Sequence, residues 1–377
     1  MKDASPSRLP SLDGWRALSI LLVLGQHSKL TIDFPAELEP FFRWAFDGDL
    51  GVRFFFVISG FLITWLLIRE REKTGAIDLR AFYLRRAIRI LPVYLVFLLV
   101  VAILTVVTDL HQSKLAWIAN LTFTTNFVNV SWPSAHLWSL AVEEQFYLLW
   151  PGIFAYLALR RKTNALWTVL LLAMVIAPIF RWITVAKLFP AALAPLFSYF
   201  SFFSYFDTLA FGCAGALVMA HQRALLESFL PATSRPLLLA AVLIMVPYVI
   251  TRLGYLNFLM SVIGFTVQGA GILILILHSV LWSKRAGYGA LNWNWLNWNW
   301  VVQIGVLSYS IYIWQQIFCA KPEVFGIQPV WWLEFPGWLL PVFIVAAVSY
   351  YCLERPLLSL RSRFREQAPA AATASAR

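Results

Sequence analysis

Long runs without a single charged residue limit what this chain can fold into more than any other feature of its sequence. Such runs occupy residues 93–107, 165–179 and 237–250, and with their flanks several reach the roughly 20 residues that the core of a bilayer requires. Backbone groups find no water in lipid, and the strands of a membrane barrel would alternate apolar and polar residues over shorter segments. The runs therefore predict an all-α fold, a polytopic transmembrane helical bundle.

Hydropathy and helix-breaking residues together predict about ten transmembrane helices. We expect these helices near residues 15–31, 50–70, 88–108, 139–159, 164–185, 199–220, 236–252, 257–281, 300–320 and 333–353. If the N-terminus is cytoplasmic, most of the 30 Lys and Arg residues fall on the cytoplasmic side, as the positive-inside rule requires. Both termini are then cytoplasmic. Residues 1–355 form the predicted transmembrane domain, and residues 356–377 a short basic tail that we expect to be disordered.

Anionic membrane lipid as a partner accounts for the net positive charge of the chain. Only 13% of the residues are charged, yet the net charge is +11. The basic residues line the loops beside anionic lipid and form no single face for a groove, so no nucleic acid partner is expected. The 3 Cys lie in apolar runs, and neither they nor the 5 His have the spacing of metal ligands, so we predict no metal site.

Polar side chains inside the predicted spans indicate a functional layer. Charged groups in a membrane are costly, so each is a candidate for function. Counted from the helix ends, His27, Glu143, Glu144, Asp207 and Gln315 all fall in the outer half of the membrane. Any one of them alone could instead make an interhelical hydrogen bond or face water near a helix end.

A second polar cluster lies on the predicted inner side. Arg80, Arg85, Arg86 and Arg89 precede the apolar run that starts at Val93. Arg85 and Arg89 share one helix face, as do Arg86 and Arg89, so this helix end can present guanidinium groups to phosphate oxygens. Ordinary positive-inside topology would explain one or two of these charges but not the whole cluster.

Arg16 and His27 connect the two levels along the first predicted helix. Their spacing returns them to nearly the same helix face, roughly 16 Å apart along the axis. One face of this helix would therefore carry a cation near its inner end and an imidazole in its outer half.

Several separated motifs follow one another in a specific order. They are Leu12-Asp-Gly-Trp-Arg-Ala17 followed by His27, Phe54-Phe-Phe-Val-Ile-Ser-Gly-Phe61, Tyr83-Leu-Arg-Arg-Ala-Ile-Arg-Ile-Leu-Pro-Val-Tyr94, His136-Leu-Trp-Ser-Leu-Ala-Val-Glu-Glu-Gln-Phe-Tyr-Leu-Leu-Trp-Pro151, Ser308-Tyr-Ser-Ile-Tyr-Ile-Trp314 and Glu354-Arg-Pro356. With this set the chain resembles, over nearly its whole length, the acyltransferase-3 family of bacterial integral membrane O-acyltransferases. By resemblance, the essential histidine of the family maps onto His27 and its paired arginine onto Arg16. The family's arginine pair maps onto Arg86 and Arg89.

The chain departs from the family pattern at two positions in the outer layer. Relatives usually carry Asp or Asn where this chain has Arg53, and many carry His where it has Gln315. The departures bear on recognition of the acceptor more than on the chemistry. The sequence also ends without the C-terminal hydrolase-like domain of some relatives, so the resemblance implies direct transfer to the acceptor or a separate partner on the outer side.

The resemblance implies an acyl-CoA-dependent O-acyltransferase of the bacterial inner membrane. Acetyl is the acyl group that the family favours, and the acceptor would be a sugar hydroxyl of a surface polysaccharide or lipopolysaccharide. A small molecule such as a macrolide is the alternative acceptor. A secondary transporter or flippase for a lipid-linked sugar would use the polar layer as its substrate site, but it predicts paired repeats that the sequence lacks. A scaffold without chemistry leaves the arginine cluster unexplained.

The expected mechanism divides the site residues by role. Arginines hold the phosphates of coenzyme A, His27 acts as general base, and Glu143 or Glu144 orients the imidazole. An acyl-histidine intermediate is the alternative to direct transfer. The expected donor-binding residues are Arg16, Arg85, Arg86 and Arg89, and the expected acceptor-binding residues are Arg53, Ser59, Trp138, Asp207 and Gln315.

Overall fold

The computed structural model describes residues 9, 11–160, 162–190, 193, 200–283 and 293–359, and this part of the chain is almost entirely helical. The long helices are α1 (Leu12–Ser28), α3 (Gly48–Thr74), α4 (Leu79–Val107), α7 (Leu137–Leu159), α8 (Thr163–Val185), α9 (Phe206–His221), α11 (Arg235–Arg252), α12 (Asn257–Trp282), α13 (Asn299–Phe318) and α14 (Leu339–Ser349). The short ones are α2 (Glu39–Ala45), α5 (Lys114–Leu121), α6 (Trp132–Ala135) and α10 (Arg223–Phe229). The described residues also form single turns: η1 (Ala36–Leu38), η2 (Thr125–Phe127), η4 (Phe202–Tyr205), η5 (Trp293–Asn297), η6 (Pro322–Phe325) and the π-helical η7 (Tyr350–Glu354).

The all-α fold is confirmed, and each expected segment overlaps one of the long helices. Within the described residues, 7 helical stretches are long and apolar enough to cross a membrane. The chain is thus a multi-pass membrane protein. Helix α1, with 17 residues, and helices α7 and α13 are not among the seven. Both α7 and α13 are long enough, but they carry the polar residues that the sequence singled out. Most of the expected tail, residues 360–377, lies outside the described residues.

Local signals explain how α3 turns into α4. Gly75 ends α3 with a φ of 75°, a left-handed conformation that glycine adopts without strain. The side chain of Asp78 then caps α4 by accepting a hydrogen bond from the backbone N–H of Ala81. The two long helices are therefore joined by a short turn, which places the arginine-rich start of α4 beside the end of α3.

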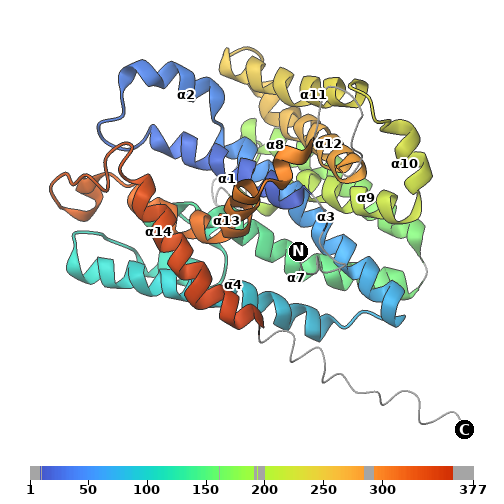
Figure 1. Ribbon diagram of the computed structural model, residues 1–377, viewed down its shortest axis with the longest axis horizontal. Helices are drawn as coiled ribbons and strands as arrows, with labels where there is room; N and C mark the ends of the chain where they lie inside the picture. The colour runs from blue at the N-terminus through green and yellow to red at the C-terminus, as the bar shows by residue number, and fades with distance from the viewer. Residues whose placement is uncertain are drawn as a thin grey trace, which may run out of the picture.

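Helices α1, α3 and α13 lie in the middle of the molecule, between α4 and α14 on one side and α11 and α12 on the other (Figure 1). Small residues allow the closest helix crossings. A Cβ added at Gly60 of α3 would collide with the Leu209 carbonyl of α9, and one at Gly212 of α9 would collide with the Val57 carbonyl of α3. Glycines at such crossings let two membrane helices approach closely. Gly60 belongs to the 54–61 motif, so the close crossing of α3 and α9 explains why this motif contains a glycine.

Candidate active site

Arginines from two helices meet at one end of the bundle, which we call the arginine end. Arg16 lies near the start of α1, and Arg86 and Arg89 lie in the first half of α4. The like charges that act most strongly on Arg89 are those of Arg16 and Arg86, so the guanidinium groups are near neighbours. Arg86 also stacks on the ring of Tyr147, 3.6 Å from its centroid. Guanidinium groups gathered in this way favour a multiply charged anion among them.

Two carboxylates of α7 approach this cluster from inside the bundle. The charges of both Glu143 and Glu144 act on Arg86. Ser59 of α3 donates a 2.7 Å hydrogen bond to Oε1 of Glu143, and Tyr147 donates a 2.9 Å hydrogen bond to the Ser59 hydroxyl. Oε1 of Glu144 is buried and has no hydrogen-bond partner among the described residues. The fold therefore links Ser59 and both predicted glutamates to the arginine end.

A further carboxylate reaches the arginine end from the last helical segment. Glu354, at the end of η7, is 5% exposed and accepts a hydrogen bond from Ser310 of α13. The charges of Arg89 and Arg16 act on it. Glu354 belongs to the Glu354-Arg-Pro356 motif, and its sequence position alone assigns it no role. The signal that could have found it is a lone carboxylate at the end of an apolar segment.

The fold separates Arg85 from the other predicted donor-binding arginines. Its guanidinium donates to Oε2 of Glu70, in α3, at 2.8 Å. Arg80, one turn earlier, is exposed. Of the arginine-rich start of α4, Arg89 therefore interacts with the charge of Arg16, and Arg86 lies one turn away on the same helix.

His27, near the other end of α1, is paired with an amide. Its Nδ1 lies 2.7 Å from Oε1 of Gln315, in α13. The Gln315 Nε2 donates to Oε1 of Gln316 at 3.1 Å, and the Cys319 thiol contacts the Gln315 Oε1 at 3.6 Å. With the amide oxygen facing the ring, Nδ1 carries the proton and Nε2 keeps the lone pair. This neutral tautomer is the one that can accept a proton at Nε2.

The structure pairs His27 with an amide, whereas Glu143 or Glu144 is the orienting residue expected from the sequence. Among the described residues, the hydrogen bond made by the His27 ring is the one to Gln315, whereas Glu143 bonds Ser59. Gln315 is fully buried, so it is placed to orient the imidazole. The sequence assigned Gln315 to acceptor binding because an amide and an imidazole at one depth do not reveal which of them touch.

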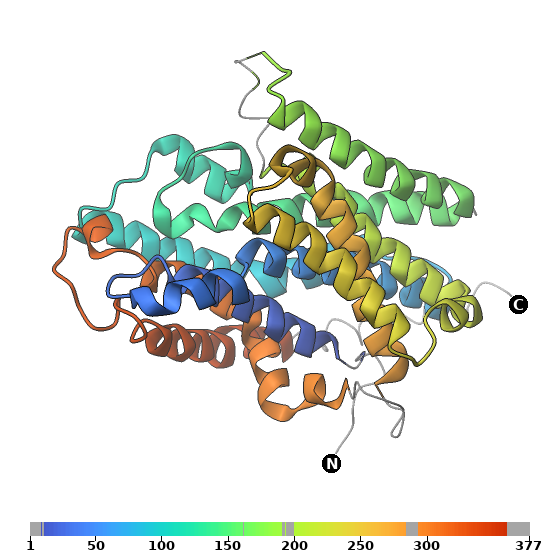
Figure 2. The same ribbon diagram turned by 90° about the horizontal axis from the view of Figure 1, so that it is seen from above.

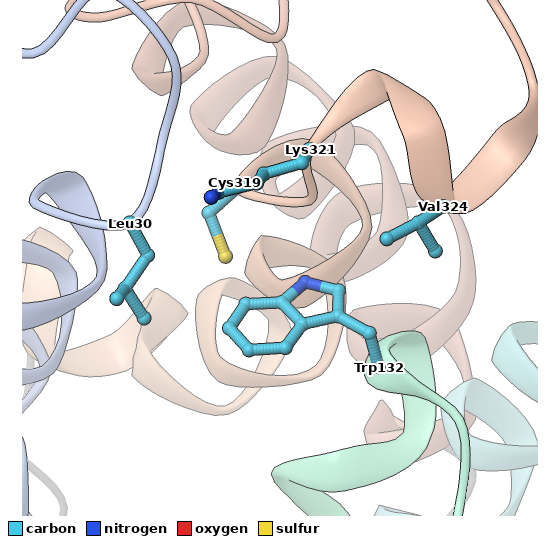
Figure 3. Close-up of a pocket in the computed structure, with 5 residues that line it drawn as sticks. All are labelled: Leu30, Trp132, Cys319, Lys321 and Val324. Carbon is cyan, nitrogen blue, oxygen red and sulfur yellow. The ribbon is translucent and has the colours of Figure 1, made fainter.

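A pocket of about 230 Å³ opens beyond His27, at the end of the bundle where α1 and α13 finish, and we call this the pocket end. It is lined by Leu30, Trp132, Cys319, Lys321 and Val324 (Figure 3). The ring of Trp132 stands edge-on to that of His27, with 6.4 Å between the ring centroids. None of the lining residues was predicted from the sequence, since they come from helix ends and loops whose positions no periodic pattern indicates.

Asp207 lies apart from His27, in a fully buried ion pair with Arg181. Helix α8 carries the arginine and α9 the aspartate, and two hydrogen bonds of 2.7 and 3.1 Å join the side chains. Thr266 of α12 donates to the same carboxylate at 2.5 Å. Oxygen acceptors thus surround the guanidinium, and the pair holds three helices together. The position of Asp207 along its predicted helix indicates an interior location but does not identify this partner.

The two remaining predicted residues also lie on the α9 side of the bundle. Arg53 is 4% exposed, lies 4.4 Å from the ring centroid of Phe265 and is 3.8 Å from Asp47. Its Nε and Nη1 have no hydrogen-bond partner among the described residues. Trp138 packs against the ring of Tyr205, with 5.2 Å between centroids. No group of three or more His, Cys, Asp or Glu side chains suited to a metal ion occurs in the described part of the chain.

The fold and the site together define a polytopic membrane protein with a guanidinium cluster at one end of a central helix and an imidazole near the other. The family comparison is specific: the model of the acyltransferase-3 family, described as an acyltransferase domain, matches residues 9–354. The chain belongs to this family. No solved structure gives a significant match.

Curated relatives carry the names of O-acetyltransferases. The peptidoglycan O-acetyltransferase OatA of Listeria monocytogenes is 29% identical over 376 residues, which cover 93% of this chain and 56% of that protein. The O-acetyltransferase OatA of Staphylococcus aureus is 38% identical over 172 residues, 42% of this chain and 26% of the relative. A putative O-acetyltransferase of S. aureus strain COL is 36% identical over 168 residues. The chain spans about half the length of the Listeria relative.

Proposed function

We propose that this protein is an O-acetyltransferase of the bacterial inner membrane, which moves an acetyl group from acetyl-CoA to a sugar hydroxyl of a cell-surface polysaccharide. The acyltransferase family and the names of the relatives support the reaction class and the kind of acceptor. The observation that carries the mechanism is the separation of two groups along α1. Arg16 belongs to the arginine end, and His27 lies roughly 16 Å further along the same helix.

The arginine end suits the phosphates of the donor. Coenzyme A carries several negative charges at one end of a long flexible arm, and Arg16, Arg86 and Arg89 offer clustered guanidinium groups to them. The buried carboxylates around the cluster balance its charge before the donor arrives. The arm of the donor would extend along α1 and bring its thioester to His27.

His27 supplies the base for the transfer. The acceptor hydroxyl gives its proton to the free Nε2 as its oxygen attacks the thioester carbonyl. A carbon–oxygen bond forms and the carbon–sulfur bond breaks, and the imidazolium returns the proton to the departing thiolate. The products are the acetyl ester and the free thiol of coenzyme A. Gln315 keeps Nδ1 protonated and stabilises the imidazolium through the bond at Oε1.

The test is release of coenzyme A thiol by the purified protein in detergent, with acetyl-CoA and an oligosaccharide acceptor. His27→Ala should abolish thiol release and transfer while leaving the protein folded, because the change removes a base. His111→Ala is the matched control, since His111 is exposed and lies in a loop. Turnover at the wild-type rate in His27→Ala would overturn the mechanism. If the wild-type protein released no thiol with any acyl-CoA tested, the assignment of acyl-CoA as the donor would be wrong.

A further inference from the structure

The pocket at the pocket end has the lining and the access of a ligand-binding site. Its walls are one indole ring, the aliphatic side chains of Leu30 and Val324, the thiol of Cys319 and one lysine. Figure 3 shows the Lys321 side chain extended across Cys319, above the indole of Trp132. Leu30 is 41% exposed, and Lys321 is exposed as well, so the pocket is reached from outside the bundle.

The same walls touch the catalytic pair. Trp132 stands edge-on to His27, and its indole N–H donates to the Gln316 backbone oxygen at 3.1 Å, which fixes the ring. On the other wall, the Cys319 thiol contacts the Gln315 oxygen that also faces His27. A molecule in the pocket would therefore contact the two side chains, Trp132 and Cys319, that flank His27 and its amide partner.

The size and chemistry of the walls indicate the occupant. Pockets for drug-sized ligands measure about 300–1,000 Å³, so about 230 Å³ is room for a single ring. The face of an aromatic ring packs well against the C–H groups of a sugar ring, and a fixed indole does so at low entropic cost. The ammonium group of Lys321 complements a negative charge on the same molecule.

We propose that this pocket binds one sugar ring of the acceptor glycan, with a negatively charged substituent at Lys321 and a hydroxyl directed to His27. This inference rests on the proposed function and deepens it, because it selects an acidic glycan as the acceptor. Trp132 and Lys321 then determine specificity, and the residues of the arginine end have no part in acceptor binding.

Binding of sugars to the purified protein tests the subsite without requiring transfer. The probes are a neutral hexose trisaccharide and the matched trisaccharide in which one ring is a uronic acid, each titrated by calorimetry. The wild-type protein should bind the acidic sugar at least about five times more tightly. Trp132→Ala should weaken both sugars about tenfold or more, Trp132→Phe should weaken them less, and Lys321→Gln should equalise them. Trp331→Ala is the control, because Trp331 is 60% exposed and does not line the pocket.

Several outcomes would overturn the subsite. These are absence of sugar binding to the wild-type protein, unchanged binding in Trp132→Ala with an unchanged thermal midpoint, and a rise in the KM for acetyl-CoA in that variant. The last result would assign the pocket to the donor arm. Sugar binding without any acetyl transfer would instead leave the subsite in place and overturn the proposed function, so the two failures are distinguishable.

Discussion

The amide of Gln315 makes contacts that agree on a single orientation. Its oxygen faces both His27 and the Cys319 thiol, and its nitrogen faces the Gln316 oxygen. An inverted amide would set its oxygen against the Gln316 oxygen and would remove the acceptor for the Cys319 thiol. The neighbours of Gln315 therefore favour one tautomer of the imidazole, which makes an uncharged residue part of the proposed catalytic arrangement.

Replacing this amide should reduce the rate without affecting the donor. Gln315→Ala removes the acceptor for the Nδ1 proton, and losing one hydrogen bond of about 1 kcal/mol or slightly more should lower kcat about five- to tenfold. The KM for acetyl-CoA should stay unchanged in steady-state assays of thiol release. Gln315→Glu keeps an acceptor oxygen and should retain more activity than Gln315→Ala. Equal kcat in wild type and Gln315→Ala would show that the pair has no catalytic role.

Substitutions of the α4 arginines should differ strongly in their effect on the affinity for acetyl-CoA. Arg86→Ala or Arg89→Ala removes a charge-assisted contact of about 1.5–3 kcal/mol, so each should weaken acetyl-CoA binding about ten- to hundredfold. Arg85→Ala is the matched control and should change binding less than threefold, because Arg85 pairs with Glu70. Calorimetry with purified variants measures all three. Similar losses for Arg85→Ala and Arg86→Ala would mean that only the overall charge of this helix end matters.

At the residue scale, the sequence predicts the depth of a polar residue better than it predicts which side chain that residue contacts. Helical spacing placed His27 and Gln315 at one depth, and the structure brings them into contact. The same reasoning placed Asp207 at that depth, yet its partner is Arg181, which sequence analysis did not select. Depth depends on position along one helix, whereas contact depends on how each helix is rotated and which neighbours it packs against. A single sequence reports the first and not the second.

At the scale of elements, helix crossings are specified by small residues. Helices α3 and α9 pack backbone to backbone at Gly60 and Gly212. Gly60 matters because α3 also carries Ser59, whose hydroxyl bonds Glu143. A shift of α3 along α9 would therefore displace a side chain of the candidate site.

Gly60→Ala should destabilise the protein, because the added Cβ meets the backbone of Leu209 and the crossing must open. Overpacking of this kind costs about 1–3 kcal/mol. Thermal unfolding in detergent should show a lower midpoint for Gly60→Ala. Gly152→Ala, in α7, is the control, since an added Cβ there meets nothing within 4 Å. A midpoint as high as that of wild type in Gly60→Ala would mean that the crossing adapts without loss.

The existence and order of the helices were predictable because lipid demands long apolar runs. The ends of the helices were less predictable. Hydropathy predicts helices from about residues 199 and 333, whereas α9 starts at Phe206 after the turn η4 and α14 starts at Leu339. The first segment begins with mostly aromatic residues, which turns and helices both accommodate, whereas the second contains Pro336 and Gly337, which favour a turn before the helix. Hydropathy therefore places such a segment in the membrane without specifying its first helical residue.

At the scale of the whole molecule, the start of α1 and the end of η7 both lie at the arginine end, since the charges of Arg89 and Arg16 both act on Glu354. His27 and the pocket end lie at the opposite end of α1. If the termini lie on the cytoplasmic side, as the basic loops predict, we expect the donor to bind from the cytoplasm and the acceptor from outside.

Sealed proteoliposomes of known orientation test this arrangement. Acetyl-CoA should support transfer only when supplied on the side that bears the termini, and the impermeant acceptor should be modified only on the opposite side. Detergent should restore transfer for every arrangement of the two substrates. Transfer with both substrates on the terminal side, and none across the membrane, would place the acceptor site at the arginine end.

The buried pair of Arg181 and Asp207 also bears on the order in which the helices insert into the membrane during synthesis. Helix α8 lies along an outer edge of the molecule (Figure 2), and its most apolar stretch has the smallest buried share among the seven spans. Its guanidinium depends on α9 and α12, which leave the ribosome later. Until they arrive, α8 presents a lone cation to hydrocarbon, at a cost that favours its staying beside the insertion machinery. We therefore expect α8, α9 and α12 to enter the bilayer as one cooperative unit.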